Sequence, residues 1–219
     1  MADRRRETAR VAVKRFGRTY AEEAGIRLAD RPPPLYQLLV LTTLLSTRIS
    51  ATIAVAAARE LFAAGYRTPQ AMRDASWQDR VDALGRAHYR RYDERTSTML
   101  GESAELCLTR WHGDLRGLRR EAGRDVRALR RLLTEFPGIG PTGADIYLRE
   151  VQAVWTDIAP YVDRKVLAGA KKLDLPASAE ELTGLVGRDE VPRFASALVR
   201  VSIGRKAADE VRAETTTQS

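Results

Sequence analysis

The sequence predicts an all-α protein. Apolar residues recur at helical spacing along most of the chain, whereas no run of alternating β-branched residues indicates a strand. Glycine and proline divide this pattern into short segments. With 219 residues, of which 44% are hydrophobic and 30% charged, the chain has the composition of a folded protein and is long enough for one large domain or two lobes.

The N-terminal half contains several predicted helices. Segment 3–25 is amphipathic and rich in arginine, which predicts one basic helix. The prolines at 32–34 are expected to end it, because proline lacks the backbone N–H that a helix interior needs. Segment 35–46 is apolar on almost every side and is therefore expected to be buried, and Ser50 is a suitable N-cap for a helix ending near residue 64. The other predicted helices of this half are 69–74, 76–84 and 89–111.

The C-terminal half continues the helical pattern. Asp125 is expected to cap a helix that reaches residue 136. After a tight turn, a second helix is expected from Pro141 to about residue 154. The polar tail 214–219 is expected to fray. The other predicted helices are 160–172, 178–186 and 190–210.

The chain is basic and has one cysteine. Lys and Arg number 37 against 29 Asp and Glu, for a net charge of +8, and only five of the basic residues are lysine. This excess favours a polyanionic partner, although a codon bias towards arginine also contributes to it. Cys107 alone excludes an internal disulfide and any four-cysteine zinc or iron–sulfur site.

No segment has the pattern of a signal peptide or a membrane span. The first ten residues are charged with no apolar stretch behind them, and the most apolar run, 35–45, is too short to cross a bilayer. We therefore expect a cytoplasmic protein of bacterial type with no membrane partner.

The most specific motif is the stretch 132–144, LLTEFPGIGPTGA, in which two predicted helices flank a Pro-Gly-Ile-Gly turn. Gly138 and Gly140 permit positive φ angles and leave no side chain in the way of an approaching surface, and Ile139 is expected to fill the gap between the helices. Backbone N–H groups at the start of the second helix would then face a phosphate oxygen. A plain αα-corner is the alternative. The turn beginning at Pro137, its apolar flanks and the basic chain favour binding to a DNA backbone.

This hairpin resembles that of the endonuclease III-type DNA glycosylases, which belong to the helix–hairpin–helix (HhH-GPD) superfamily. Three further segments are similar to the family: 44–48 to its Leu-Leu-Ser segment, 111–114 to the turn ahead of the hairpin, and 160–166 to its Val-Asp segment. The resemblance spans residues 31 to 204. It implies a two-lobed helical fold with the active-site cleft between the lobes.

For this chain, the resemblance implies a central lobe of residues 31–150 ending in the hairpin, and a second lobe formed by residues 1–30 and 151–219. Many relatives carry a four-cysteine iron–sulfur cluster, which Cys107 alone cannot supply. No cluster is therefore expected, and segment 194–204 is expected to provide core packing in its place. The implied partner is double-stranded DNA with a damaged or mispaired base, bound by a monomer at the nucleoid.

By resemblance, Asp163 is the catalytic carboxylate at the cleft, 23 positions after Gly140. Breaking an N-glycosidic bond develops positive charge on the sugar, which a carboxylate stabilises while it orients or deprotonates the attacking water. The base must first leave the stack. Aspartate is also a common N-cap, so Asp163 is expected to cap a helix that begins near Arg164, and the two roles are compatible.

Thr142 stands where relatives that also cleave the backbone have a lysine. Threonine cannot form a Schiff base with the sugar, so a monofunctional base-excision-repair glycosylase is expected. Two alternatives remain open. One is a non-catalytic DNA-binding or lesion-sensing protein, and the other is a bifunctional glycosylase and lyase that uses a non-standard lysine such as Lys165.

The resemblance also implies DNA contacts. Arg48 takes the family's wedge position, where its flat guanidinium would fill the gap left by a flipped base, unless it is only a surface arginine at a helix start. Arg164 and Lys165 follow the catalytic position. The predicted DNA-binding residues are therefore Arg48, Pro137, Gly138, Ile139, Gly140, Thr142, Arg164 and Lys165.

Two further groups are candidates. The cluster of His88, Tyr89 and Tyr92 would either line a base pocket or form a half-buried amphipathic turn. A monovalent cation, Na⁺ or K⁺, is implied by the resemblance at the hairpin, held by the backbone carbonyls of Thr134, Phe136 and Ile139.

A basic run precedes the hairpin and is opposed in sequence by only Asp114, Glu121 and Asp125. It is either a solvated helix face or a surface that follows the DNA backbone. Its members are Arg110, Arg116, Arg119, Arg120, Arg124, Arg127, Arg130 and Arg131.

Overall fold

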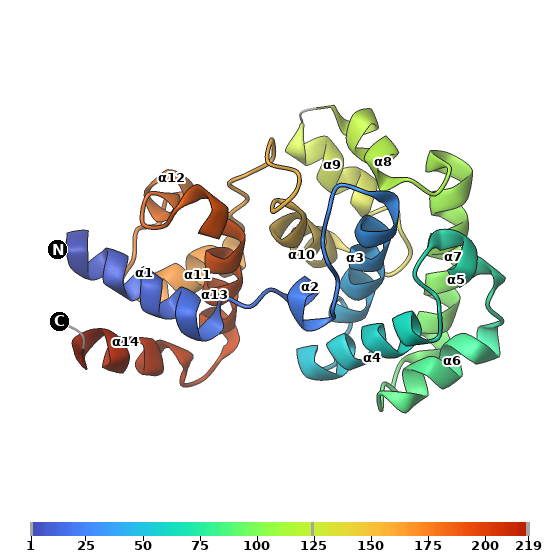
Figure 1. Ribbon diagram of the computed structural model, residues 1–219, viewed down its shortest axis with the longest axis horizontal. Coiled ribbons are helices and arrows are strands. Elements are labelled where there is room, and N and C mark those ends of the chain that lie inside the picture. The colour runs from blue at the N-terminus through green and yellow to red at the C-terminus, as the bar shows by residue number, and fades with distance from the viewer. Residues whose placement is uncertain (1, 124, 218–219) are drawn as a thin grey trace. The chain divides into compact units, whose positions relative to one another are not determined.

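The computed structural model describes residues 2–123 and 125–217, and within these ranges it contains helices, turns and loops but no strand, which confirms the predicted all-α class. The chain forms two compact units (Figure 1). Unit 1 joins the N-terminal segment up to Tyr20 to the C-terminal segment from Trp155, and unit 2 comprises Ala21–Val154. None of the described helices is long and apolar enough to cross a membrane.

Unit 2 is built around one buried helix, α3 (Pro32–Leu45), which packs against four others. Because α3 is apolar on almost every side, neighbours can bury it all round, as its sequence predicted. Of the other helices, α4, α7, α8 and α10 contact α3 directly. The bounds are α2 (Tyr20–Glu23), α4 (Ala51–Ala63), α5 (Pro69–Asp74), α6 (Trp77–Arg86), α7 (Asp93–Trp111), α8 (Leu115–Ala122), α9 (Val126–Leu133) and α10 (Pro141–Val151).

The three prolines at 32–34 begin a helix instead of merely ending one, so the expectation for them was wrong. They occupy the first turn of α3, where backbone N–H groups have no intrahelical acceptor and the fixed φ of proline suits the helix. The predicted basic helix 3–25 is also interrupted. It consists of α1 (Ala2–Phe16) and the short α2, with Gly17 after the last turn of α1.

The unit boundaries lie at 20/21 and 154/155, whereas the sequence placed them at 30/31 and 150/151. Residues 21–30 belong to unit 2 because their backbone is tied to its last helix. The Ala21 N–H donates to the Glu150 carboxylate at 2.9 Å in a buried position. No periodicity in the sequence reports such a side-chain contact to the backbone.

Unit 1 is centred on α13, which packs against the first and the last helix of the chain and against α11. Phe194, Leu198 and Val201 of α13 lie in its hydrophobic core with Val166 of α11 and Val11 of α1. Of the segment 194–204, which was expected to form a core helix, residues 194–203 belong to α13 and Gly204 follows its end. The helices of this unit after α1 are α11 (Arg164–Lys172), α12 (Ala179–Thr183), the 3₁₀ turn η1 (Arg188–Glu190), α13 (Val191–Ile203) and α14 (Ala207–Thr217).

The predicted helix 190–210 is divided at Gly204, and α14 then continues to Thr217. Residues 214–217 were expected to fray but are helical. Thr215 is buried and its hydroxyl donates to the Val211 carbonyl at 2.8 Å. The buried Thr215 thus anchors residues that were expected to fray because of their polar composition.

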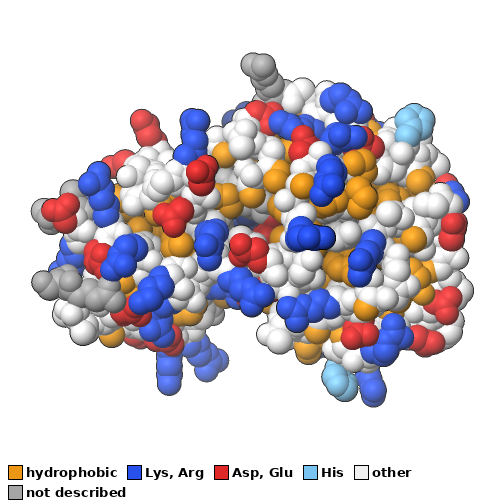
Figure 2. Space-filling view, viewed as in Figure 1, with side chains coloured by type: hydrophobic (Ala, Val, Ile, Leu, Met, Phe, Trp, Pro, Cys, Tyr) orange, Lys and Arg blue, Asp and Glu red, His pale blue; other side chains and the backbone are white. Residues whose placement is uncertain are grey.

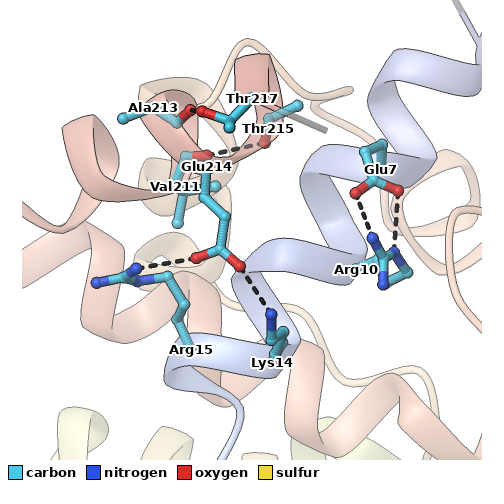
Figure 3. A network of polar contacts seen from close by, with 9 residues as sticks. All are labelled: Glu7, Arg10, Lys14, Arg15, Val211, Ala213, Glu214, Thr215 and Thr217. Atoms are coloured by element: carbon cyan, nitrogen blue, oxygen red, sulfur yellow. Dashed lines mark hydrogen bonds and ion pairs between the residues drawn. The ribbon is translucent and has the colours of Figure 1, made fainter. Parts of the chain in front are cut away.

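Ion pairs hold α14 against α1 (Figure 3). The Glu214 carboxylate accepts from Lys14 and from Arg15, both at 2.9 Å, and Arg15 also donates to Glu210 at 2.7 Å. Hydrogen bonds from Arg15 and Lys14 lower the pKa of Glu214 from 4.5 to about 2. The two ends of the chain are thereby joined through charge as well as through the core.

This lowered pKa predicts an acid-dependent loss of stability in unit 1. A depressed carboxyl pKa stabilises the fold above the unfolded value of 4.5 and ceases to do so as pH falls towards about 2. At neutral pH we expect Glu214→Gln to lower the Tm by no more than about 2 °C, because the pairs are solvated. The difference should vanish near the folded pKa. Thermal melts of both proteins across this range test it, and a difference that grew on acidification would contradict it.

Candidate nucleic-acid interface

The predicted hairpin is present between α9 and α10. Asp125 caps α9 as expected, since its carboxylate accepts the Arg127 N–H at 2.8 Å. In the turn, Phe136 and Ile139 are buried, and the Ile139 N–H donates to the Phe136 carbonyl at 3.0 Å. The Phe136 ring lies 5.3 Å from that of Trp111, centre to centre. The two apolar residues therefore anchor the turn to unit 2 while its backbone stays at the surface.

The two glycines of the turn act differently. Gly138 has φ +83°, and a Cβ there would lie 2.8 Å from the Met99 sulfur. Gly140 has φ −91°, so of the two glycines only Gly138 uses the positive φ that glycine permits. A Cβ on Gly140 would meet nothing within 4 Å, which leaves this position open to solvent. Gly138 is thus required by the fold, whereas Gly140 keeps the surface free of a side chain.

Helix α10 begins directly after Gly140, with Pro141 at its first position and no side-chain cap at its N-terminus. Thr142 is exposed on the first turn. The first N–H groups of a helix lack intrahelical acceptors and carry its partial positive charge. These properties are what an anion-binding site at the start of α10 requires, and phosphate binding there stays a prediction.

The end of α3 lies beside this start of α10, a contact that the sequence did not reveal. A Cβ on Gly143 would lie 2.5 Å from Ser46 Oγ, so the glycine allows the two segments to approach closely. The Ser46 hydroxyl donates to the Thr42 carbonyl at 2.7 Å. Arg48 follows in the exposed loop between α3 and α4. A glycine in the first turn of a predicted helix was the one available signal.

Of the candidate base-pocket residues, Tyr89 does not line a pocket, so that prediction was wrong. It is fully buried, with its hydroxyl 2.8 Å from Thr47 Oγ1 and 3.2 Å from Thr96 Oγ1, and burial raises its pKa. It therefore serves the core by joining the loop after α3 to α7. His88 is exposed with φ +59°, and Tyr92 is half-buried at the N-cap of α7, so these two stay predictions.

The basic run before the hairpin is more neutralised than its sequence indicated. Carboxylates distant in sequence supply the pairs: Arg119 meets Asp30 at 3.3 Å, and Arg130 meets Asp145 across the hairpin at 2.8 Å. Arg110 pairs with Glu121 and Glu135, and Arg116 with Asp114. Arg124 lies outside the described residues. Within the described part of the run, the exposed arginines without an ion pair are Arg120, Arg127 and Arg131.

Figure 2 shows that Lys and Arg side chains are spread over the visible face of unit 2 and alternate there with apolar atoms. Acidic side chains are interspersed among them. On this face the charge of the unit is therefore distributed over several elements and is not confined to one run of sequence.

Asp163 belongs to unit 1 and caps α11, as the sequence predicted. Its Oδ1 accepts the backbone N–H groups of Lys165 at 2.9 Å and Val166 at 3.0 Å. The cap holds the carboxylate in one position at the helix start, where Asp163 is half-buried. Arg164 and Lys165 are exposed on the first turn of α11.

The carbonyls proposed to hold a cation lie in the hairpin. That of Phe136 accepts the Ile139 N–H, which occupies one of its two lone pairs. Backbone carbonyls suit hard cations, so the donor set is compatible with Na⁺ or K⁺. Cys107 is buried in α7, and burial raises the pKa of its thiol to about 12. Across the described residues, no group of three or more His, Cys, Asp or Glu side chains is placed to hold a metal ion.

The chain was compared with protein families, curated proteins and solved structures. No protein-family model matches the sequence, and no curated protein matches it either. Among solved structures, the chain is similar to endonuclease III in a trapped covalent intermediate with DNA, an estranged-adenine complex. The TM-score is 0.48 and the identity 16%, over 89% of this chain and 84% of that one. It is also similar to a non-covalent endonuclease III–DNA complex, with a TM-score of 0.48 and 17% identity, over 83% of this chain and 81% of that one.

Proposed function

We propose that this protein is a DNA glycosylase of base-excision repair that hydrolyses the N-glycosidic bond of a damaged or mispaired base flipped out of duplex DNA. The observation that carries the proposal is the hairpin. Its apolar residues Phe136 and Ile139 are buried, Gly140 has free space beside it, and the start of α10 is exposed and has no side-chain cap. The resemblance of the hairpin and the Val-Asp segment to the HhH-GPD superfamily supports the same function.

In this proposal the hairpin anchors one phosphate of the DNA backbone. N–H groups at the first turn of α10 donate to the phosphate oxygens, and the partial positive charge of the helix adds to the attraction. Gly140 allows the phosphate to approach the backbone. Carbonyls of Thr134, Phe136 and Ile139 would hold a monovalent cation, which supplies charge that offsets the phosphate. Arg48 would occupy the space that the flipped base leaves in the duplex.

Asp163 supports cleavage of the glycosidic bond. Its ionised carboxylate stabilises the positive charge that develops on the sugar as the base leaves, and it orients and deprotonates the water that attacks the anomeric carbon. The two backbone hydrogen bonds to Oδ1 fix the side chain before the substrate binds. Such fixed positioning reduces the reorganisation needed in the transition state.

We propose a monofunctional enzyme because the position of the lyase lysine is Thr142, which has no amine. A lyase reaction would need another amine, such as that of Lys165, which is exposed next to the Asp163 cap. A protein that binds lesions without cleaving them is the other alternative. We further propose that the enzyme acts as a monomer. We also propose that it has no iron–sulfur cluster, because its one cysteine, Cys107, cannot supply four ligands.

A panel of duplexes, each carrying a single lesion or mispair, tests the proposed reaction. Each duplex is incubated with the protein, and half of each sample is then treated with alkali. Strand breaks that appear only after alkali support a monofunctional glycosylase. Breaks without alkali, together with a covalent complex trapped by borohydride, would identify a lyase. Binding without a product on every duplex would identify a sensor.

The two turn glycines separate folding from binding. Gly138→Ala should lower the free energy of unfolding of unit 2 by about 1–3 kcal/mol, because alanine resists positive φ and its methyl group meets Met99. Gly140→Ala should leave stability within about 0.5 kcal/mol yet weaken DNA binding about fivefold or more, because the methyl group stands where the phosphate approaches. Urea denaturation and fluorescence anisotropy with duplex DNA measure the two effects. Unchanged DNA affinity in Gly140→Ala would argue against the hairpin as the anchor.

A further inference from the structure

A cleft in unit 2, away from the hairpin, is lined by four arginines. This cleft, of about 460 Å³, lies at the N-terminal end of α3 and the C-terminal end of α4. Such a volume is within the range of small-molecule sites. None of the described residues that line it is acidic. Its polar and aromatic lining consists of Arg27, Arg31, Gln37, Arg59, Phe62 and Arg67.

Two carboxylates that are adjacent in sequence to arginines of this cleft form ion pairs with arginines outside it. Glu60 on α4 pairs with Arg86 at 2.9 Å, and Asp30 pairs with Arg119 at 3.3 Å. Arg27 is exposed and has no ion pair among the described residues, and the same holds for Arg31. Several like charges around one concavity repel each other and favour an anionic ligand.

The other two arginines are held in place by the backbone. Arg67 Nε donates to the Phe62 carbonyl at 2.8 Å, and Arg59 donates to the Glu23 carbonyl. Each bond uses one of the five N–H donors of a guanidinium group. These contacts fix the direction of the two side chains without cancelling their charge.

The donors for a ligand must come from side chains. The first turn of α3 consists of prolines, which offer no N–H, so α3 contributes only the positive end of its dipole. Guanidinium groups are planar forks that match the oxygens of a phosphate. We propose that this cleft binds a phosphate-bearing anion. Arg27 and Arg31 are its principal hydrogen-bond donors, and Arg59 and Arg67, which are held by backbone carbonyls, add positive charge from fixed positions.

This site differs from the hairpin. Helix α3 has 14 residues and is therefore about 21 Å long, and the hairpin contacts its C-terminal end whereas the cleft lies at its N-terminal end. The proposal does not depend on glycosylase activity. The phosphate could belong to a free small molecule or to a DNA backbone that passes this end of the unit.

Pyrophosphate is the probe for the site itself. Isothermal titration should show saturable binding to the full-length protein in a buffer of constant ionic strength. The double variant Arg27→Gln/Arg31→Gln should weaken it at least about tenfold, because two charge-assisted contacts are lost. Arg5→Gln/Arg6→Gln is the matched control, since it removes the same charge from exposed positions on α1 and should bind as the wild type does. If pyrophosphate binding were weakened equally in both variants, the loss of net charge alone would explain it, and the proposal would be overturned.

A duplex-DNA titration of the same variants distinguishes the sources. If the phosphate belongs to DNA, Arg27→Gln/Arg31→Gln should make the slope of log K for DNA binding against log salt concentration shallower, by the amount that corresponds to about two phosphate contacts. If it belongs to a free anion, DNA affinity should match that of the control variant while pyrophosphate binding is lost. If the Arg27→Gln/Arg31→Gln variant binds both pyrophosphate and DNA as the control does, the proposed site is overturned. If the wild-type protein binds pyrophosphate but releases no base from any duplex, only the proposed glycosylase function fails.

Discussion

Gly169→Ala is expected to lower the free energy of unfolding of unit 1 by about 3 kcal/mol, although it adds only one methyl group. Gly169 lies in α11 where this helix crosses α13. A Cβ at this position would be 1.9 Å from the Leu198 carbonyl oxygen and 2.6 Å from its carbon. Both atoms are backbone, so no side-chain rotation relieves the overlap. The two helices must move apart, which opens the close contact between α11 and α13 in the unit's core.

The matched control is Gly85→Ala in α6, where a Cβ would meet nothing within 4 Å. The same methyl group there should stabilise unit 2 by about 0.5–1 kcal/mol through its higher helix propensity. Urea denaturation followed by circular dichroism, with hydrogen exchange to resolve the two units, measures both changes. A Gly169→Ala variant as stable as the wild type would show that α11 and α13 do not pack as closely as described.

The Gly169 variant also bears on function, because α11 carries Asp163 at its N-terminus. A helix displaced from α13 no longer holds its first turn in the same place. We therefore expect base release to fall along with stability, while anchoring by the hairpin of unit 2 changes little. Exchange protection at Lys165 and Val166, whose N–H groups bond Asp163, reports directly on that turn.

Local signals in the sequence predicted much of this structure. The apolar run of α3 predicted a buried helix, and the Asp125 and Asp163 caps follow from the preference of aspartate for helix starts. The hairpin followed from its Pro-Gly-Ile-Gly turn. Each of these features depends on neighbours within a few residues, so one sequence is enough to find it.

Features that depend on contacts between distant segments were missed. Gly143 and Gly169 look like weak helix residues in sequence, yet each permits close approach by a segment that is remote along the chain. Tyr89 was predicted to line a base pocket or to lie half-buried in an amphipathic turn, but it is fully buried and its hydroxyl lies within hydrogen-bond distance of Thr47 and Thr96. The arginines of the basic run find carboxylates in other elements for the same reason. Periodicity reports which face is apolar and does not report which partner covers it.

The largest effect on activity is expected from Asp163→Asn. Asparagine keeps the side-chain oxygen that accepts the N–H groups of Lys165 and Val166, so the cap of α11 should persist and stability should change by less than about 0.5 kcal/mol. The negative charge and the ability to accept a proton are lost. On whichever lesion duplex the wild-type protein processes, base release should therefore slow by at least about 100-fold, and DNA affinity should change less than about twofold.

Asp163→Ala separates the cap from the chemistry. It removes both the charge and the hydrogen-bond acceptor, so we expect the same loss of base release together with about 1 kcal/mol of lost stability. Single-turnover rates, anisotropy with duplex DNA and urea denaturation of the two variants provide the three readouts. If Asp163→Asn released bases at the wild-type rate while Asp163→Ala was only less stable, the carboxylate would be a helix cap alone. The positive charge that develops on the reacting sugar would then need another stabilising group in the site.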